Sequence, residues 1–331
     1  MEIDVLIVTH NRLEQLKRCL AGISSAGQNQ LFTINIHVLI NGVDIQTTQY
    51  LNSQPHVHFY QEPHTQKPGL ARNILISHSH AEWIFFIDDD AYPQHNIFTE
   101  LKTLISEHPA GILFGGPNVT PPHAPLFQKV SGIILGSLWG AMHTRSRYAP
   151  IGKTRAAKEA YLSSCNLFVN RKVFEITEYP EHYRTAEESY LILNILKSWP
   201  NDSWYSPELI VYHDRRQNLS AFIKQIYRYA RGRGQLVFDG KTRAPIYFVP
   251  TLFLVLILLA PLSETIKEIM LRFMPIYIAA NLLCTLYQMI SNRHLFALGA
   301  FFLYPITHIT YALGLVSGVF RSAIQHKETR K

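Results

Sequence analysis

The chain has 331 residues and a formal net charge of +7, and it is 47% hydrophobic with only 17% charged residues. So low a charged fraction argues against a wholly soluble protein, and with the basic balance it favours a protein that acts at a membrane surface or on nucleic acid. The three cysteines, Cys19, Cys165 and Cys284, have no metal-binding spacing and indicate a reducing compartment.

The N-terminal quarter alternates strands and helices. Hydrophobic periodicity predicts strands at 3–8, 32–40, 57–60 and 83–87, and helices at 13–23 and 70–80. This alternation is typical of right-handed crossovers and a parallel sheet. Because ligands bind beyond the carboxyl ends of such strands, polar residues that follow them are expected to gather on one rim.

The segment at 83–87 is apolar throughout, so it is predicted to be a strand buried on both faces. It runs directly into Asp88, Asp89 and Asp90. Strand side chains alternate, so Asp88 and Asp90 should point the same way. A divalent cation with oxygen ligands would relieve their repulsion. The alternative is an acidic turn that only solvates the end of the strand.

Two common nucleotide-binding motifs are missing. There is no G-x-G-x-x-G after the first strand and no G-x-x-x-x-G-K-[ST] anywhere, which argues against a dinucleotide oxidoreductase and a P-loop NTPase. A metal-bound diphosphate fits better. Lys67 and Arg72 lie where a helix begins, and helix N-termini favour anions. The alternative is a solvated helix start.

Three blocks of sequence together resemble a known family. They are VLIVTHNR at 5–12, KPGLARN at 67–73 and FIDDDA at 86–91. In this order they resemble the family 2 glycosyltransferases of the GT-A fold, in particular bacterial exopolysaccharide transferases of the succinoglycan type. The resemblance covers about the first 240 residues. It implies an α/β fold, with a Rossmann-like, mixed but mostly parallel sheet flanked by helices.

The resemblance also implies roles for individual residues. Asp88 and Asp90 match the D-x-D motif that holds Mn²⁺ or Mg²⁺ on a nucleotide-sugar, for which a UDP-sugar is favoured. The residues expected to contact the nucleotide or its diphosphate are Thr9, Asn11, Arg12, Lys67, Arg72 and Asp89. Ile40 departs from the pattern, because the family usually has a uracil-contacting aspartate there. Asn41 and Asp44 are the candidates to replace it.

A second acidic pair follows in the segment TAEESY at 185–190. It resembles the Gly-Glu-Asp segment where the family places its catalytic base, with Glu188 at the aspartate and Glu187 at the preceding glutamate. Ala186 stands at the glycine. An acceptor hydroxyl must lose its proton as it attacks, so a carboxylate general base is expected, and direct displacement would invert the anomeric carbon. The alternative is a helix start whose acids favour its dipole.

Two further motifs follow. His213 comes after a short predicted strand, and related enzymes use a histidine near this point for the metal or the diphosphate; a structural histidine is the alternative. The segment QIYRY at 225–229 resembles the Q-x-x-R-W motif of processive synthases, which assigns Gln225 and Arg228 to the donor site. A basic amphipathic helix on anionic lipid is the other interpretation, and the two are compatible.

After residue 241 the sequence becomes strongly apolar. Segments at 269–290 and 295–320 are long enough to span a bilayer, and 246–262 is marginal. The basic stretch at 224–243 and the tail at 321–331 both indicate the cytoplasmic side. We therefore expect two spans with 246–262 re-entrant or interfacial, and three spans with the tail outside as the alternative.

The sequence thus predicts an inverting, non-processive glycosyltransferase of the cell inner membrane with its catalytic part in the cytoplasm. Its partners would be a nucleotide-sugar, a lipid-linked or growing glycan acceptor and the membrane, but no nucleic acid. The predicted parts are a donor-binding half at 1–115, an acceptor-binding half at 116–221, an interfacial helix at 222–245, membrane helices at 246–320 and a basic tail at 321–331. The alternatives are a membrane-tethered metal-dependent phosphohydrolase and a non-catalytic sugar-nucleotide-binding subunit.

Overall fold

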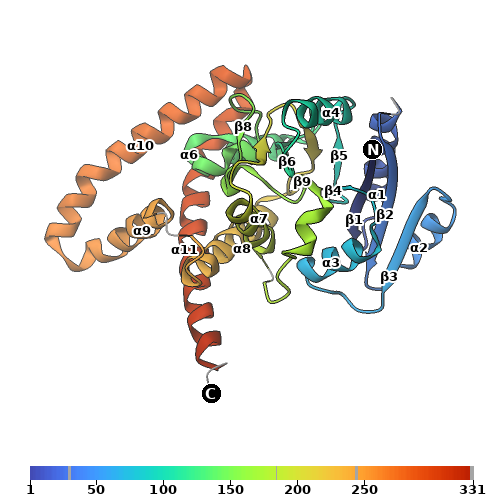
Figure 1. Cartoon of the computed structure of the whole chain (residues 1–331). Helices are drawn as coiled ribbons and strands as arrows, with labels where there is room; N and C mark the ends of the chain where they lie inside the picture. The colour runs from blue at the N-terminus through green and yellow to red at the C-terminus, as the bar shows by residue number, and fades with distance from the viewer. Residues whose placement is uncertain (29–30, 184, 243–244, 329–331) are drawn as a thin grey trace. The chain divides into compact units, whose positions relative to one another are not determined.

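The computed structural model describes residues 1–28, 31–183, 185–242 and 245–328. The chain forms two compact units (Figure 1). The first, here called the sheet unit, comprises residues 1–122 and 143–214. The second, the helical unit, comprises residues 123–142 and 215–331. The two units are described separately.

The first half of the sheet unit alternates as predicted. Its elements are β1 (Glu2–Thr9), α1 (Leu13–Gly27), β2 (Thr33–Asn41), α2 (Ile45–Asn52), β3 (Val57–Glu62), α3 (Pro68–His78) and β4 (Trp83–Ile87). Helix α2 was not predicted. It forms because the Asp44 side chain accepts a hydrogen bond from the Thr47 backbone N–H and caps the helix.

The second half contributes shorter elements. They are β5 (Ala91–Pro93), α4 (Ile97–Glu107), β6 (Leu113–Gly115), β7 (Asn118–Val119), β8 (Arg155–Ala156), η2 (Glu159–Tyr161), β9 (Asn166–Asn170), η3 (Arg171–Glu175), α7 (Glu187–Ser198), β10 (Ser203–Tyr205) and β11 (Val211–His213). The main sheet has the order β3-β2-β1-β4-β9-β6-β10-β8, and β5-β11-β7 form a small second sheet. Strand β9 runs antiparallel to both its neighbours, so the sheet is mixed but mostly parallel, as predicted.

Strand β4 lies inside the main sheet and is buried along its whole length, as predicted. Its side chains alternate between two hydrophobic clusters. Phe85 packs on the α1 and α4 side, where it stacks on Phe168 at 4.0 Å, while Phe86 packs on the α3 and α7 side. Figure 1 shows β1 to β4 side by side. This double burial fixes where the acids after β4 emerge.

A buried carboxylate also lies near the start of β1. Asp4 is 1% exposed and accepts hydrogen bonds of 2.7–2.9 Å from four donors: Asn35 Nδ2, Ser79 Oγ, His80 N and Ala81 N. Burial alone would raise the pKa of Asp4, but His37 and the hydrogen-bond donors lower it well below its usual value. Asp4 therefore joins β1, β2 and the segment before β4 as a structural anchor.

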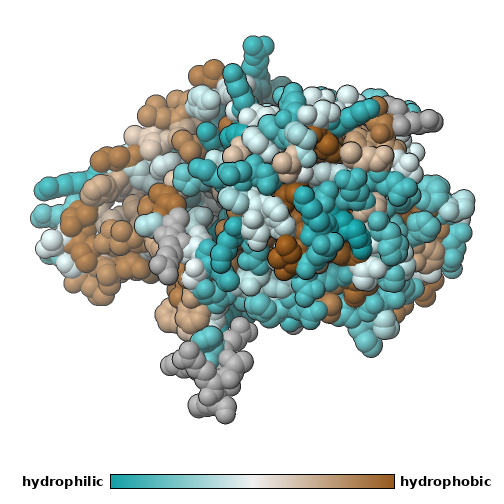
Figure 2. Space-filling view, viewed as in Figure 1, coloured by the Kyte–Doolittle hydropathy of each residue, from teal (hydrophilic) through white to brown (hydrophobic). Residues whose placement is uncertain are grey.

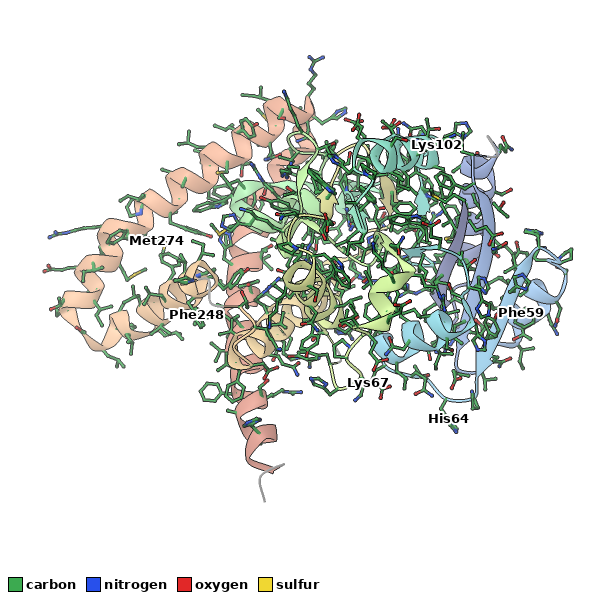
Figure 3. All side chains as sticks on the ribbon, in the orientation of Figure 1. Phe59, His64, Lys67, Lys102, Phe248 and Met274 are labelled. Atoms are coloured by element: carbon green, nitrogen blue, oxygen red, sulfur yellow. The ribbon has the colours of Figure 1, made fainter. Side chains whose placement is uncertain are left out.

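The helical unit contains α5 (Leu126–Gly136), α6 (Leu138–Ala141), α8 (Leu219–Phe238), η4 (Pro245–Phe248), α9 (Val249–Leu259), α10 (Glu264–Asn292), η6 (Leu295–Gly299) and α11 (Ala300–Glu328). Among the residues that the structure describes, three helical segments are long and apolar enough to cross a membrane: Pro245–Leu262, Glu264–Asn292 and Leu295–Ile324. Figure 2 shows apolar side chains over α9 and α10. Figure 3 labels Phe248 of η4 and Met274 of α10. The number of crossings stays a prediction.

Helix α8 packs closely against α11. A Cβ atom at Gly234 would lie 2.2 Å from the Leu315 carbonyl oxygen, and one at Gly318 would lie 2.1 Å from the Arg231 carbonyl oxygen. Only glycine allows two helices to approach so closely. The predicted interfacial helix at 222–245 therefore coincides largely with a real helix that is held against a candidate span, while its position in the membrane stays a prediction.

Residues 123–142 belong to the helical unit, although the residues before and after them in the chain belong to the sheet unit. His308 on α11 bonds to the Trp139 carbonyl oxygen at 2.8 Å and to the Tyr277 hydroxyl of α10 at 2.9 Å. These bonds join α6 to two candidate spans. The sequence analysis did not predict that residues 123–142 belong to the helical unit. The predicted division at 115 and 221 into donor and acceptor halves stays a prediction.

Candidate active site

The three acids after β4 have different surroundings. Arg12 Nη1 donates to Asp89 Oδ1 and to Asp90 Oδ2, each at 2.9 Å, and Thr9 Oγ1 donates to Asp89 Oδ2 at 2.8 Å. Thr9 ends β1, which is the parallel neighbour of β4. The Asp88 side chain is 35% exposed, whereas those of Asp89 and Asp90 are almost buried. The structure thus brings these predicted residues together on one rim.

The pKa of Asp89 is affected by its burial and by the acids beside it. Burial raises its pKa to about 6, and the neighbouring Asp90 adds to the effect, while Arg12 and Thr9 oppose it. Burial and the neighbouring Asp90 therefore outweigh the effect of Arg12 on the pKa of Asp89. A group of acids left in this condition at the end of a buried strand is typical of a functional site.

His213 reaches the same cluster from the small sheet. Strand β11 runs antiparallel to β5, with His213 opposite Ala91, and His213 Nε2 lies 3.0 Å from Asp90 Oδ1. One donor atom each of Asp88, Cys165 and His213 lies within 4.8 Å of the others. Carboxylate and imidazole donors fit a divalent cation. The predicted metal ligands Asp88, Asp90 and His213 are therefore close together, and their role as ligands stays a prediction.

The sequence did not point to Cys165 as a site residue. Ile87 of β4 pairs with Asn166 of β9 in the antiparallel register, so Cys165 enters β9 where Asp88 leaves β4. The position of Cys165 in the chain was visible in the sequence. The antiparallel pairing that sets it beside Asp88 was not.

Arg72 connects the acids of β4 to those of α7. Its Nη2 donates to Asp88 Oδ1 at 3.3 Å, and its Nη1 donates to Glu187 Oε1 at 3.0 Å. Burial raises the pKa of Glu187, and Glu188 adds to this, while Arg72 opposes it. Lys67 is exposed in the loop before α3 (Figure 3). The structure thus brings Arg72, rather than the exposed Lys67, into the acid cluster.

Glu188 lies beside Glu187 at the start of α7, with its side chain 24% exposed. It accepts hydrogen bonds from Arg147 Nη1 at 3.3 Å, Ser163 Oγ at 3.2 Å and Ser164 N at 2.9 Å. Arg147 and the Ser164 amide are site residues that the sequence analysis missed, because neither belongs to a motif. Together they hold the Glu188 carboxylate in one orientation.

The backbone at Ala186 is strained. Ala186 precedes α7 with a φ of 71°, a left-handed conformation that favours glycine. This explains the glycine of the family pattern that the segment 185–190 resembles. The protein retains the turn with alanine, at a cost of about 1 kcal/mol, so the position of the acid pair depends on it.

The two candidates for base recognition have structural partners. The Asp44 carboxylate accepts from the Asn11 backbone N–H at 2.9 Å as well as from Thr47. Asn41 bonds through both ends of its amide to the backbone of Gln66. These bonds shape the loops that contain Asn11 and Gln66. Contact of Asn41, Asp44 or Asn11 with a base stays a prediction.

Gln225 and Arg228 both lie on α8, in the helical unit. Gln225 is buried and donates to the Tyr229 hydroxyl at 2.9 Å, whereas Arg228 is exposed. The motif that they resemble therefore exists as a helical turn. Contact of these two side chains with a sugar donor stays a prediction.

A mostly parallel sheet with acids beyond an inner strand, and a second acid pair linked to them, is typical of glycosyltransferases of the GT-A fold. The family model Glycosyl transferase family 2 matches residues 4–176, which is more than half of the chain. The chain therefore belongs to glycosyltransferase family 2, and the resemblance found in the sequence is confirmed.

One solved structure supports this fold, and a second is a weaker match. The mannosyltransferase PcManGT from Pyrobaculum calidifontis, in complex with GDP-Man and Mn²⁺, matches 97% of this chain and 87% of its own with 13% identity and a TM-score of 0.57. The S. aureus protein TarS 1-349 in complex with UDP-GlcNAc matches 99% of this chain and 92% of its own, with 14% identity and a TM-score of 0.48. No curated protein matches the sequence.

Proposed function

We propose that this family 2 glycosyltransferase moves a sugar, with inversion, from a nucleotide-diphosphate donor to a lipid-linked or growing glycan acceptor at the cytoplasmic face of the cell inner membrane. The observation that carries the proposal is the connection through Arg72. Arg72 bonds to Asp88 and to Glu187, so the predicted metal-binding acids and the predicted catalytic acid pair belong to one network of bonds.

At the donor end, Asp88, Asp90 and His213 would hold Mn²⁺ or Mg²⁺. When bound, the cation would offset the charge of the leaving nucleoside diphosphate. Arg12 keeps Asp90 in place through a 2.9 Å bond. Arg72 adds a fixed positive charge: burial alone would lower its pKa, but Tyr179 and the nearby carboxylates raise it. A UDP-sugar is the favoured donor.

At the acceptor end, Glu188 would take the proton of the attacking hydroxyl as that oxygen bonds to the anomeric carbon and the bond to the diphosphate oxygen breaks. The Ser164 amide and Arg147 orient the carboxylate. Glu187 holds Arg72 beside Asp88 and acts as a positioning residue. Attack opposite to the leaving group inverts the anomeric centre.

The helical unit supports action at a membrane. Three helices are candidates to cross it, and α8 exposes the basic residues Lys224 and Arg228 beside a candidate span. Such residues attract anionic lipid headgroups. Three candidate spans in the described residues are too few to enclose a polymer channel by themselves, which supports the transfer of single sugars rather than processive synthesis.

The test compares Glu188→Gln with Glu187→Gln in the full chain, with Mn²⁺, a panel of nucleotide-sugars and lipid-linked acceptors. Glu188→Gln should lower the rate of acceptor-dependent diphosphate release about a thousandfold, and Glu187→Gln should lower it less. Full activity of Glu188→Gln would rule out this base. Release that needs no acceptor would indicate a phosphohydrolase, and binding without release a non-catalytic subunit.

A further inference from the structure

The strand pairing of the main sheet brings a thiol to the acid cluster. Ile87, the last residue of β4, pairs with Asn166, the first residue of β9. Asp88 directly follows Ile87, and Cys165 directly precedes Asn166. Cys165 is 3% exposed and is not in a disulfide. Since β4 and β9 are both buried, the position of this thiol beside a carboxylate is fixed by the sheet.

A nitrogen donor completes the group. His213 arrives from β11, and a single donor atom of each of Asp88, Cys165 and His213 lies within 4.8 Å of the other two. Bonds of about 2.0–2.3 Å place the donors around a tetrahedral ion roughly 3.3–3.8 Å apart. The three side chains therefore need to close by only about 1 Å to share one ion.

We propose that Asp88, Cys165 and His213 form a cation site with a sulfur ligand, which binds thiophilic divalent ions such as Zn²⁺ more tightly than Mg²⁺. Sulfur, imidazole and carboxylate together suit Zn²⁺, whereas Mg²⁺ prefers mainly oxygen ligands in an octahedron. On binding, the Cys165 thiol releases its proton to solvent.

This inference extends the proposed function, because Asp88 and His213 are also the proposed ligands of the donor's cation. Zn²⁺ in this site would occupy both groups and compete with Mg²⁺ for them. The competing explanation is that Cys165 only packs in the core, where it belongs to the same hydrophobic cluster as Phe85 and Phe168. The two explanations differ in whether the sulfur bonds to a metal.

The first experiment needs no variant. The purified full chain, loaded with one equivalent of Zn²⁺ and without donor or acceptor, is measured by X-ray absorption at the zinc edge. One sulfur neighbour at about 2.3 Å is expected. A shell of nitrogen and oxygen alone would overturn the proposal.

The second experiment measures affinity by competition with a zinc-binding dye. Cys165→Ser should weaken Zn²⁺ binding about tenfold or more and change Mg²⁺ binding less than twofold. Cys19→Ser is the matched control, since the Cys19 thiol donates to the backbone carbonyl oxygen of Asp88, at 3.7 Å, and does not belong to the group of three donor atoms. Equal zinc affinity of wild type and Cys165→Ser would also overturn the proposal. If Cys165→Ser does not fold, the absorption measurement on the wild type decides alone.

Both measurements are independent of sugar transfer. A zinc–sulfur bond in a chain that transfers no sugar would support the thiol site and contradict the proposed function. Transfer by a chain without that bond would do the reverse.

Discussion

Two buried aspartates at opposite ends of the same strand pair differ in their neighbours and in the direction of their pKa shifts. Asp4 lies near the start of β1, and Asp89 follows the end of β4, its parallel neighbour. Asp4 is 1% exposed and Asp89 is 4% exposed. Hydrogen bonds lower the pKa of Asp4 against the effect of burial, whereas burial and Asp90 raise that of Asp89 to about 6.

The difference lies in the neighbours. Asp4 has His37 at 3.6 Å and several hydrogen-bond donors around it, so its charge stabilises the fold. Asp89 shares one arginine with Asp90, and Asp88 lies next to them. One end of the sheet thus surrounds its carboxylate with hydrogen-bond donors, whereas the other places three acids side by side, which is typical of a functional site.

The largest effect on activity is expected at the acids that follow β4. Asp90→Ala should lower the rate of sugar transfer about a thousandfold, because the cation that would offset the charge of the leaving group loses a ligand. The thermal unfolding temperature should not fall, since the substitution also relieves repulsion with Asp89. Transfer assays and circular dichroism on the full chain measure both. Glu107→Ala, at an exposed position on α4, is the control.

At the opposite end the pattern should be reversed. Asp4→Ala leaves several buried donors without their acceptor and should lower the free energy of unfolding by about 3 kcal/mol. The rate of transfer per folded molecule should not change. Because the pKa of Asp4 is lower in the folded state, its contribution exists above about pH 4 and is lost as the pH falls further. An Asp4→Ala protein that is stable but inactive would break the comparison.

Asp89 should show the opposite pH dependence. Its pKa is higher in the folded state, so its contribution to stability is complete below about pH 4 and is lost as the pH rises to about 6. Relative to wild type, Asp89→Asn should therefore gain about 2 kcal/mol between pH 4 and pH 7. Thermal melts across this range measure the gain. A difference that does not vary with pH would mean that Arg12 fully compensates Asp89.

The smallest effect is expected from the backbone strain at Ala186, which precedes the second acid pair. Ala186→Gly should raise the free energy of unfolding by up to about 1 kcal/mol, because glycine tolerates the φ of 71°. Ala221→Gly, in the first turn of α8, should instead lower it by about as much. Equal effects of both substitutions would show that the turn at Ala186 holds no strain.

Much of the fold followed from local pattern. The strand at 83–87 and its double burial, the alternation before it and the resemblance to family 2 glycosyltransferases are confirmed. Helix α2 was missed because a cap at Asp44, rather than a hydrophobic stripe, starts it. The place of 123–142 in the helical unit was missed because contacts between distant helices leave no local signature.

For the candidate site, the sequence by itself determined which residue types stand at the ends of which strands. Asp88, Asp90 and Arg12 follow strands that their neighbours in the chain encode, since side-chain periodicity is a local property. Only the tertiary structure decided that Cys165 lies beside Asp88, that Arg147 holds Glu188, and that Arg72 joins both acid groups. These contacts depend on strand register and helix packing across distant segments, which no short stretch of sequence specifies.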